Sequence, residues 1–396
     1  MQDTLLAAEE TLWICERAQA LGFALCGVAP AEPFPELSHY SEWLQRGYAG
    51  EMQYLNDARR ADPRAPAPGA RSLIVCALNY NSPLPYSSAV RPGTNRPGSP
   101  RGWISRYAWG DDYHQLLGSK LNALRAEMKA HFTEAFEARA YADTGPIHER
   151  AAAKYAGLGW LAKNTLLINQ SQGSWLFLGV IITSLALSPS LGANDLPPAD
   201  RCGTCRACID ACPTEAIVEP YVLDASRCIA YLTIELRGTI PEDLRAPLGS
   251  HVFGCDICQD VCPWNRRSPR TAAAEFQPRT FAGSPNAAKH DDQSPALSLY
   301  LPDLLQLAQL PEGDFRELFR GSPIKRTKWR GLLRNTCIAL GNAQIDTVSP
   351  TGQEILSALQ KLSASPDPAI AESALWALSR IQRNDSQRSA SQAAVS

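Results

Sequence analysis

The sequence predicts a three-part fold: an α/β domain over residues 1–190, a small cysteine-rich α+β module over residues 191–270, and α-helical repeats over residues 299–382. Three observations support this prediction. Helix-like and strand-like apolar patterns alternate up to about residue 190, eight of the twelve cysteines lie between residues 191 and 269, and helical periodicity returns at Leu299. A chain of 396 residues is long enough for two or three domains, each with its own core.

The first domain is expected to alternate helices and strands. Its predicted elements are helices at residues 5–21, 116–132 and 146–156, and strands at residues 23–28, 72–78 and 175–187. Apolar residues at helical spacing indicate the helices, the first of which ends at Gly22 and the last at Gly157. The strands are short apolar runs, and residues 175–187 are rich in β-branched side chains, which favours a buried strand. Residues 80–102 are rich in Pro, Gly and Ser and predict a long loop.

The C-terminal part is expected to be helical. The segments 332–340 and 370–378 look alike and lie about 40 residues apart, which is the period of paired-helix repeats such as HEAT repeats. Residues 271–298 are polar and rich in Ala and Pro, so we expect a linker there. The polar segment 383–396 is expected to be a disordered tail.

Composition and charge exclude some classes of function. Lys and Arg total 38 and Asp and Glu total 40, so the net charge of −2 excludes a uniformly basic nucleic-acid coat but not a local basic patch. The longest apolar stretch, residues 175–187, is shorter than the ~20 residues that span a membrane, so no membrane partner is expected. The N-terminal sequence MQDTLLAAEE is acidic and resembles no export signal. We therefore expect a cytoplasmic protein whose thiols stay reduced.

Two cysteine runs carry the strongest chemical signal, and each ends in Cys-Pro. The first has the spacing C-x2-C-x2-C-x3-C-P, and the second has C-x2-C-x3-C-P with one more cysteine 27 positions upstream. In bacterial ferredoxins, three closely spaced thiolates bind one cubane cluster and the cysteine before Pro binds the other cluster. This crossed rule predicts one 4Fe-4S cluster on Cys202, Cys205, Cys208 and Cys262, and a second on Cys212, Cys228, Cys255 and Cys258.

The alternative is a pair of zinc sites. Zinc modules usually show two C-x2-C pairs that a longer loop separates, and neither run has that pattern. The spacing therefore favours iron–sulfur clusters. The four remaining cysteines stand singly in apolar surroundings, where small buried thiols are common: Cys15, Cys26, Cys76 and Cys337.

Four segments point to more than a ferredoxin module. They are ISRYAWGDDYH at residues 104–114, YADTGPIHERAAAKYAGLGWLAKNTLLI at 141–168, EPYVLDASRCIAYLTIELRG at 219–238, and VFGCDICQDVCPWN at 252–265. They resemble epoxyqueuosine reductases, which are cobalamin-dependent enzymes with two 4Fe-4S clusters that act on tRNA and are related to reductive dehalogenases. The resemblance extends in the same order from residue 1 to about residue 380. It implies that the α/β domain binds cobalamin.

The resemblance also implies roles for individual residues. Asp143, in the D-T-G segment, matches the proton donor of the family and adjoins the cofactor. The residues that match positions near the corrin are Arg60, Ser105, Gly157, Gly159, Lys163, Asn164 and Thr165. Ala162 stands where many relatives have Gly, a departure that we expect to be tolerated. To donate a proton at pH 7, Asp143 needs a raised pKa, which desolvation under a corrin could provide.

Each of these roles has a structural alternative. Asp143 could simply cap a turn or a helix, since Asp suits the D-T-G-P sequence. Lys163 and Arg60 could be solvated surface charges. The motif D-x-H-x-x-G, in which a histidine binds cobalt, is not matched by residues 112–118 because the spacing is one residue too long. We therefore interpret His114 as an ordinary residue near a helix start and expect no protein imidazole on cobalt.

A basic segment is the candidate tRNA-binding surface. Between residues 314 and 334 seven Lys or Arg residues face two acidic ones, and its centre holds Lys325, Arg326, Lys328 and Arg330. Such a patch can neutralise phosphates, and Trp329 could stack on an unpaired base. The alternative is a solvated helix face with Trp329 in the core.

Together, the residues and the resemblance predict an enzyme that reduces epoxyqueuosine to queuosine at the wobble position of tRNA, the last step of queuosine biosynthesis. Cobalamin would be reduced through the two clusters by an external low-potential electron donor, and Asp143 would supply a proton. We expect a monomer. One alternative is a reductive dehalogenase, although such enzymes are typically exported and lack a basic helical tail. The other is an electron-transfer protein, which would leave the first 190 residues and Asp143 without a role.

Overall fold

Four strands form the central sheet of the computed structural model, which describes residues 2–90, 99–192, 194–281 and 297–393. The order is β1-β2-β7-β4, and every neighbouring pair is antiparallel. The bounds are β1 Leu25–Pro30, β2 Ser72–Asn79, β4 Ala138–Tyr141 and β7 Leu176–Thr183. Strands β1, β2 and β7 are those that apolar runs predicted. The short strand β4, with Arg139 and Tyr141 among its four residues, has no such run and was missed.

The antiparallel pairing corrects the predicted α/β class, because alternating helices and strands normally give a parallel sheet. The first domain is α+β. The physical reason lies in the connection between β1 and β2, which holds only short helices and returns the chain in the opposite direction instead of making a helical crossover. These helices are η1 Pro35–His39, α2 Tyr40–Gln45, η2 Gln53–Asn56 and η3 Ala58–Ala61.

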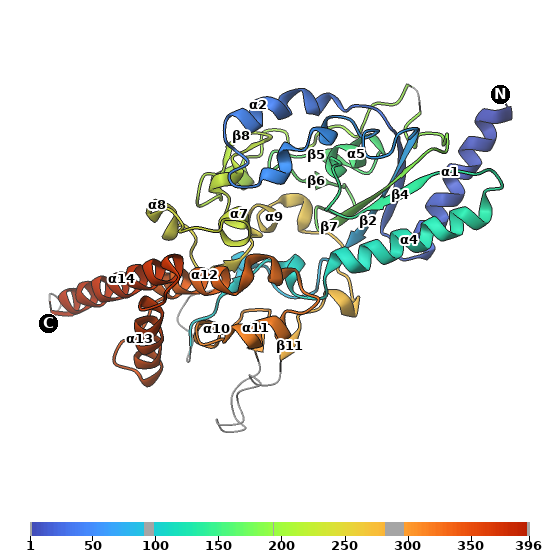
Figure 1. Cartoon of the computed structure of the whole chain (residues 1–396). Helices are drawn as coiled ribbons and strands as arrows, with labels where there is room; N and C mark the ends of the chain where they lie inside the picture. The colour runs from blue at the N-terminus through green and yellow to red at the C-terminus, as the bar shows by residue number, and fades with distance from the viewer. Residues whose placement is uncertain (1, 91–98, 193, 282–296, 394–396) are drawn as a thin grey trace.

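Helices cover both faces of this sheet because alternate residues of a strand point to opposite sides. Ile74 of β2 packs in one buried cluster with Leu117 of α4, and its neighbour Val75 packs in another with Ala152 of α5. The covering helices are α1 Gln2–Ala20, α4 Tyr113–His131 and α5 Glu149–Tyr155. Figure 1 shows α4 and α5 on opposite sides of the sheet. Gly179 of β7 lets α4 approach closely, since a Cβ there would lie 2.7 Å from a methyl carbon of Leu121.

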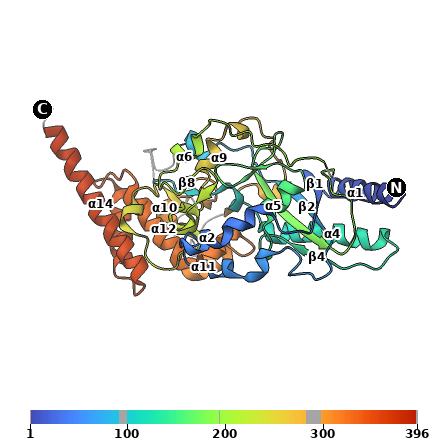
Figure 2. The ribbon, with the colours of Figure 1, turned by 90° about the horizontal axis from the view of Figure 1, so that it is seen from above.

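The cysteine-rich module is built from short elements. It contains α6 Ala207–Asp210, β8 Ile217–Glu219, β9 Val222–Leu223, η5 Ala225–Arg227, α7 Ile229–Ile234, α8 Glu242–Arg245, β10 His251–Phe253, α9 Ile257–Asp260 and η6 Pro263–Asn265. The one-turn helices α6 and α9 lie against each other, and each precedes a Cys-Pro pair (Figure 2). Strand β10 pairs in parallel with β3 Trp103–Ile104, which joins the module to the first domain.

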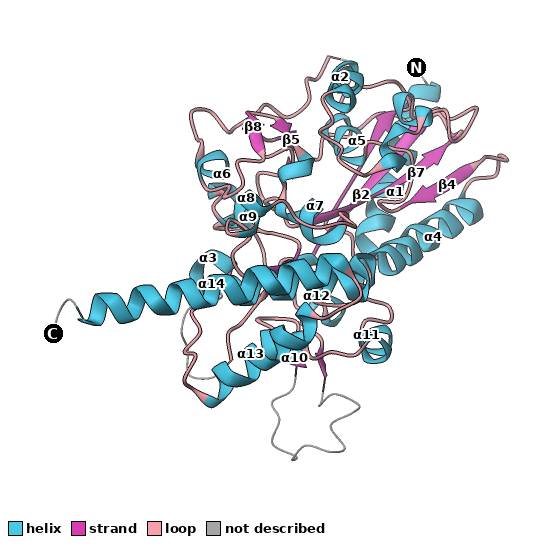
Figure 3. Cartoon of the chain, turned by 60° about the vertical axis from the view of Figure 1, so that its left-hand side comes forward, coloured by secondary structure: helices cyan, strands magenta, loops and turns pink. Residues whose placement is uncertain are grey.

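The C-terminal helices share one core with the module. Phe253 of β10 and Leu332 of α12 belong to the same buried cluster. The helices are α10 Leu304–Ala308, α11 Glu312–Leu318, α12 Lys328–Asn342, α13 Pro350–Ser363 and α14 Pro368–Ala393, and η9 Pro323–Thr327 precedes α12. The two similar segments lie in α12 and α14, which cross closely: a Cβ on Gly341 would lie 2.8 Å from the Cα of Ala377. Figure 3 shows α14 extending past the body of the molecule.

Three further predictions need comment. The tail expected to be disordered from residue 383 continues α14 as far as Ala393, because its Arg, Gln, Ser and Ala residues include no Gly or Pro that would end a helix. The expected linker is partly structured, since β11 Thr280–Phe281 pairs with β12 Leu297–Ser298, and residues 282–296 lie outside the described residues. The expected loop at 80–102 contains α3 Ser87–Val90, and residues 91–98 are likewise not described.

The remaining strands β5 Trp160–Leu161 and β6 Leu167–Ile168 form a hairpin, and η4 Arg106–Ala108 follows β3. Among the described residues, no helix combines the length and apolar character that crossing a membrane requires.

Candidate functional site

Four of the eight clustered cysteines line one cavity. Its volume is about 260 Å³, and Cys202, Cys205, Cys208 and Cys262 all contribute to its wall. The first three come from the loop before and through α6, and Cys262 comes from the end of α9. These four cysteines are the set that the crossed rule predicted for the first cluster. Trp264 and Ile168 close part of the cavity with apolar surface.

The other four cysteines lie close to one another and to the first group. Burial raises the pKa of the Cys258 thiol well above its ordinary value, and the charges of Cys228, Cys208 and Cys212 raise it further. The pKa of the Cys255 thiol is raised in the same way, by burial and then by the charges of Cys258 and Cys228. Thiols that influence one another so strongly lie close together. A bound cation would favour their deprotonated form, as metal ligation requires.

Within the described part of the chain, no three His, Cys, Asp or Glu side chains are arranged to hold a single metal ion. A cubane cluster asks for a different arrangement, since its four thiolates surround a body of iron and sulfide rather than one ion. The cavity walled by four cysteines fits a cluster of that kind.

Lys163 and Asn164 hold the cysteine loops rather than an open cofactor pocket. The ammonium of Lys163 donates to the carbonyls of Gly203, at 2.5 Å, and Cys205, at 3.0 Å. The amide of Asn164 donates to the carbonyl of Cys258 at 3.3 Å. Both side chains are buried. The alternative that Lys163 is a solvated surface charge is therefore wrong, and the K-N pair connects the loops of both cysteine groups.

The glycines of the same segment have local packing roles. A Cβ on Gly159 would lie 2.2 Å from the carbonyl oxygen of Ile168, so only glycine fits there. Gly157 ends α5 with a positive φ of 77°. Thr165 also has a positive φ, 63°, and its carbonyl oxygen accepts a hydrogen bond from Arg150 at 2.5 Å. Thr165 and Arg150 lie in one accessible part of the site.

Ser105 and Arg60, the other two expected cofactor residues, lie in different surroundings. The hydroxyl of buried Ser105 donates to Asp256 at 2.5 Å, and Asp256 directly follows the cluster candidate Cys255. Arg60 is partly buried and donates to the carbonyl of Tyr54 at 3.4 Å. The expected cofactor residues therefore divide into those that build the scaffold and those, such as Arg60 and Thr165, that remain accessible.

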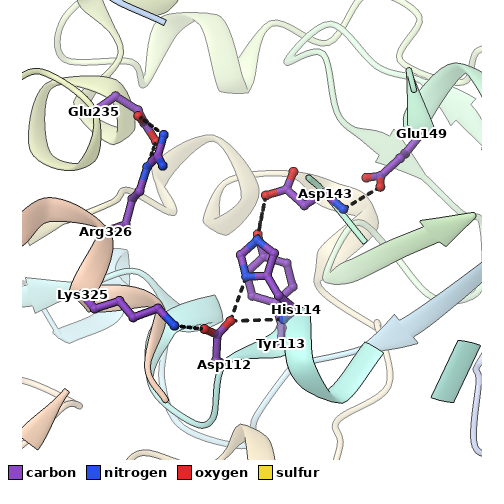
Figure 4. A network of polar contacts seen from close by, with 8 residues as sticks. All are labelled: Asp112, Tyr113, His114, Asp143, Glu149, Glu235, Lys325 and Arg326. Atoms are coloured by element: carbon purple, nitrogen blue, oxygen red, sulfur yellow. Dashed lines mark hydrogen bonds and ion pairs between the residues drawn. The ribbon is translucent and has the colours of Figure 1, made fainter. Parts of the chain in front are cut away.

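Asp143 lies at the centre of a polar network (Figure 4). It has a positive φ of 61° in the D-T-G turn after β4, which turns its carboxylate toward the start of α4. The hydroxyl of Tyr113 donates to Asp143 at 2.6 Å, and Nε2 of His114 lies 3.3 Å from the same oxygen. The backbone N–H of Asp143 donates to the carboxylate of Glu149 at 2.7 Å.

The surroundings move the pKa values of His114 and Asp143 in opposite directions. Burial opposes the charge on both partners. The hydrogen bonds with Asp112 and Asp143 nevertheless raise the pKa of His114 to about 9. In the same way, desolvation acts against ionisation of Asp143, but hydrogen bonds from His114 and Tyr113 hold its pKa below its ordinary value. The raised pKa that we expect for Asp143 under a bound corrin therefore stays a prediction. Burial, and then the charge of Asp143, raise the pKa of Glu149 to about 8.

Sequence reasoning missed the role of His114. The residue was interpreted as an ordinary helix-start residue, yet it connects Asp112 to Asp143. A local signal exists: Asp112 is the N-cap of α4, and its side chain accepts from the backbone N–H of His114, which is typical of Asp before a helix. The same carboxylate also lies 2.7 Å from Nδ1 of His114. What the sequence did not reveal is that the D-T-G turn would meet the other face of the ring.

The basic segment does not form a free cationic surface. Lys325 pairs with Asp112 at 2.8 Å, Arg326 with Glu235 at 2.8 Å, and Arg330 with Asp367 at 2.8 Å. Lys328 is exposed and begins α12 with a positive φ of 63°.

Trp329 packs against the core, as the structural alternative predicted, and is not presented for base stacking. Its indole N–H donates to the carbonyl of Leu310 at 2.7 Å, and its ring packs against the core. A second aromatic residue near this segment is more exposed to solvent. Tyr54 is 48% exposed, and the guanidinium of Arg326 lies over its ring at 5.8 Å. Lys325 and Arg326 therefore belong to the rim of the Asp143 site (Figure 4).

Comparisons with known proteins agree on one family. The model described as "4Fe-4S double cluster binding domain" matches residues 201–265, and the model "Epoxyqueuosine reductase QueG, DUF1730" matches residues 60–144. The chain is 36% identical to the epoxyqueuosine reductase of Shewanella oneidensis, with 98% of this chain and 92% of the relative covered. It is 37% identical to that of Escherichia coli, with 92% and 88% covered.

Solved structures give the same result. A crystal structure of epoxyqueuosine reductase with an epoxyqueuosine-modified tRNA-Tyr stem loop superposes with a TM-score of 0.79 at 28% identity, covering 94% of this chain and 90% of that one. The Bacillus subtilis epoxyqueuosine reductase, at 28% identity and a TM-score of 0.77 with the same coverage, is described with a catalytic aspartate loop swung out of its active site. Identity above 30% over nearly the whole of several relatives, together with both family models, shows that this chain belongs to the epoxyqueuosine reductase family of oxidoreductases.

Proposed function

We propose that the protein reduces epoxyqueuosine to queuosine at the wobble position of tRNA, as the last step of queuosine biosynthesis. The observation that carries the proposal is the accessible Asp143 carboxylate, which shares a proton-bearing contact with His114 in a chain that also brings two groups of four cysteines together. Deoxygenation of an epoxide needs a source of protons and a path for electrons.

The balance of the reaction sets what the residues must supply. Removing the epoxide oxygen breaks two carbon–oxygen bonds, forms a carbon–carbon double bond, and releases water after uptake of two electrons and two protons. The imidazolium of His114 and the carboxylate of Asp143 together hold one transferable proton, which can reach the substrate oxygen through Asp143. Solvent supplies the second proton. Tyr113 orients the carboxylate through its 2.6 Å hydrogen bond.

The electrons would travel through two 4Fe-4S clusters. In this proposal one cluster is bound by Cys202, Cys205, Cys208 and Cys262, and the other by Cys212, Cys228, Cys255 and Cys258. The second group lies toward the acid site: Asp256 follows Cys255, and the pKa of the buried Tyr107 is raised by burial and then by the charges of both Asp143 and Asp256. An external low-potential donor would deliver the electrons to the first cluster.

Cobalamin would bind beside Asp143. The side chain of Asp143 is 59% exposed, so its carboxylate is accessible to a bound cofactor. Asp143, Arg60 and Thr165 are the residues that would contact it, while Ser105, Gly157, Gly159, Lys163 and Asn164 support its surroundings. When bound, cobalamin supplies the reducing electrons to the epoxide.

His114 fits a cofactor without a protein imidazole on cobalt. Both of its ring nitrogens already face a carboxylate, Nδ1 that of Asp112 at 2.7 Å and Nε2 that of Asp143 at 3.3 Å. A histidine that ligates a metal through one nitrogen needs that nitrogen without a proton. The raised pKa of His114, about 9, supports a proton-holding role instead; its hydrogen bonds with the two carboxylates outweigh burial.

The tRNA would approach over the rim that Lys325 and Arg326 form, with Lys328 and Arg330 further along α12. Phosphates can compete for these side chains, since Lys325 is 54% exposed and Arg326 is 52% exposed even though their carboxylate partners are largely covered. We further propose that α12 to α14 act as a HEAT-like tRNA-binding unit, and that the protein works as a cytoplasmic monomer.

The test is anaerobic incubation of the reconstituted, reduced protein with epoxyqueuosine-containing tRNA, followed by nucleoside analysis. Queuosine should form in the presence of cobalamin and only traces in its absence. Protein with full iron and cobalamin content that leaves epoxyqueuosine unchanged under strong reduction would refute the proposed activity. Reduction of the tRNA without cobalamin would refute the cofactor assignment alone.

A further inference from the structure

One buried carboxylate connects the RNA-facing rim to the proton-bearing pair. Asp112 is only 4% exposed and lies between two cations (Figure 4). One of its oxygens accepts from the ammonium of Lys325 at 2.8 Å, and the other lies 2.7 Å from Nδ1 of His114. The second ring nitrogen of His114 reaches Asp143. Four side chains thus form a continuous line from the protein surface to the proposed proton donor.

Lys325 and Asp112 differ in how freely their side chains can move. Lys325 is 54% exposed, so its long side chain can turn toward solvent at small cost. Its backbone is fixed, because the hydroxyl of Thr327 donates to the carbonyl of Thr233 at 2.8 Å and the backbone N–H of Asp112 donates to the carbonyl of Gly321 at 2.9 Å. Asp112 cannot follow the ammonium outward, since it caps α4 from a buried position.

We propose that Lys325 is a positioning residue through which capture of a tRNA phosphate fixes the proton held between His114 and Asp143. A phosphate beside the rim draws the Lys325 ammonium away from Asp112. The buried carboxylate then has the His114 imidazolium as its remaining cationic partner and holds that proton more tightly. The acid is thereby loaded when the substrate is in place. The inference rests on the proposed tRNA substrate and adds a coupling between RNA binding and proton supply.

The sign of the effect follows from the charges around the ring. Lys325 competes with His114 for Asp112, so removing Lys325 raises the affinity of His114 for its proton, and so does moving Lys325 onto a phosphate. The other titratable or charged groups that interact with the ring or with its two carboxylate partners are Tyr54, Tyr107, Tyr113, Glu149, Arg150 and Arg326. Arg326 neutralises Glu235 on the opposite rim, so this pair adds little net charge.

Proton uptake on RNA binding tests the coupling without any turnover. The holoenzyme is titrated with an unmodified anticodon stem loop at pH 9, near the pKa of about 9 to which hydrogen bonds with Asp112 and Asp143 raise His114 against the effect of burial. Calorimetry in buffers of different ionisation enthalpy gives the number of protons taken up. The wild type should take up a fraction of a proton, and Lys325→Ala should lose more than half of that uptake. Lys325→Arg should retain it, and His114→Gln should abolish it.

Lys328→Ala is the matched control, because it removes the same charge from the same segment, whereas the cations that pair with Asp112 are His114 and Lys325. It should weaken binding while leaving the proton uptake as in the wild type. Equal uptake by the wild type and Lys325→Ala would overturn the inference.

Kinetics add a second readout. In the wild type, the alkaline limb of the pH profile should lie higher for kcat than for kcat/KM, by about half a pH unit, because the first reports the RNA-bound enzyme and the second the free enzyme. In Lys325→Ala the two limbs should coincide. Profiles that differ equally in both proteins would contradict the coupling. An enzyme inactive on epoxyqueuosine tRNA would instead refute the proposed function, and the calorimetric result would still decide the coupling.

Discussion

Nε2 of His114 lies 3.3 Å from Oδ2 of Asp143, although 29 residues separate them in the chain. The contact joins the first turn of α4 to the D-T-G turn that follows β4. In the proposed mechanism the two side chains act as a pair, in which the imidazole holds the proton and the carboxylate passes it to the substrate.

Replacing Asp143 with Asn should separate chemistry from structure. Asn keeps the size of the side chain and makes turns and caps about as well as Asp, so the D-T-G turn should persist. The acid is lost, and general acid catalysis is typically worth ~10²–10⁴-fold. Queuosine formation should fall by that range in single-turnover assays, while cobalamin binding and cluster reduction stay normal. Near-normal turnover by Asp143→Asn would show that the residue only builds the turn.

The rate of the wild-type enzyme should fall at alkaline pH. Burial works against the imidazolium, but its hydrogen bonds with Asp112 and Asp143 raise the pKa of His114 to about 9, so the pair keeps its proton below that pH and loses it above. The ion pair also stabilises the fold below the ordinary pKa of histidine, ~6.5, and this contribution is lost as the pH rises through about 9. Measured kcat should be flat from pH 7 to about 8 and then decline. In His114→Gln this alkaline step should be absent.

Metal analysis checks the cluster assignment. Reconstituted protein should hold about eight iron and eight sulfide per chain, as two cubane clusters require. Cys262→Ala should damage the cluster of Cys202, Cys205 and Cys208, because all four thiols line one cavity. Paramagnetic resonance of the reduced protein should show which signal disappears. Selective loss of the other cluster would reverse the partition, and stoichiometric zinc with little iron would contradict iron–sulfur binding altogether.

The Co(II) form of bound cobalamin should lack an axial nitrogen ligand from the protein. His114 faces a carboxylate with each ring nitrogen, and the sequence lacks a properly spaced D-x-H-x-x-G motif. Paramagnetic resonance should therefore show cobalt hyperfine lines without nitrogen superhyperfine splitting. Such splitting, if it disappears in His114→Gln, would identify His114 as a ligand and contradict the proton-holding role.

The triple variant Lys325→Ala, Arg326→Ala and Lys328→Ala should bind tRNA more weakly and with a flatter salt dependence, since each phosphate contact releases counterions. Binding curves at several salt concentrations measure both effects. Iron and cobalamin content should match the wild type, because the first two side chains are half-exposed and Lys328 is exposed. An unchanged affinity and an unchanged salt dependence would show that the segment is only a solvated helix face.

The sequence by itself determined the features that depend on neighbours along the chain. The Cys-Pro runs predicted the two ligand sets because three closely spaced thiolates bind one cubane cluster and the cysteine before Pro binds the other. Apolar runs located β1, β2 and β7, and helical periodicity located α1, α4 and the C-terminal helices. The family resemblance pointed to Asp143 and to an enzyme of this family, and the comparisons confirm the family.

The tertiary structure decided what depends on distant pairs. Antiparallel pairing of the sheet, the hold of Lys163 on the loop of Gly203 and Cys205, and the ion pair of Lys325 with Asp112, 213 residues away, leave no trace in local spacing. The contact of His114 with Asp143 could not be predicted for the same reason. The pKa of a carboxyl group depends on the charges and donors that the fold brings to it, and at Asp143 a histidine and a tyrosine from another helix outweigh desolvation.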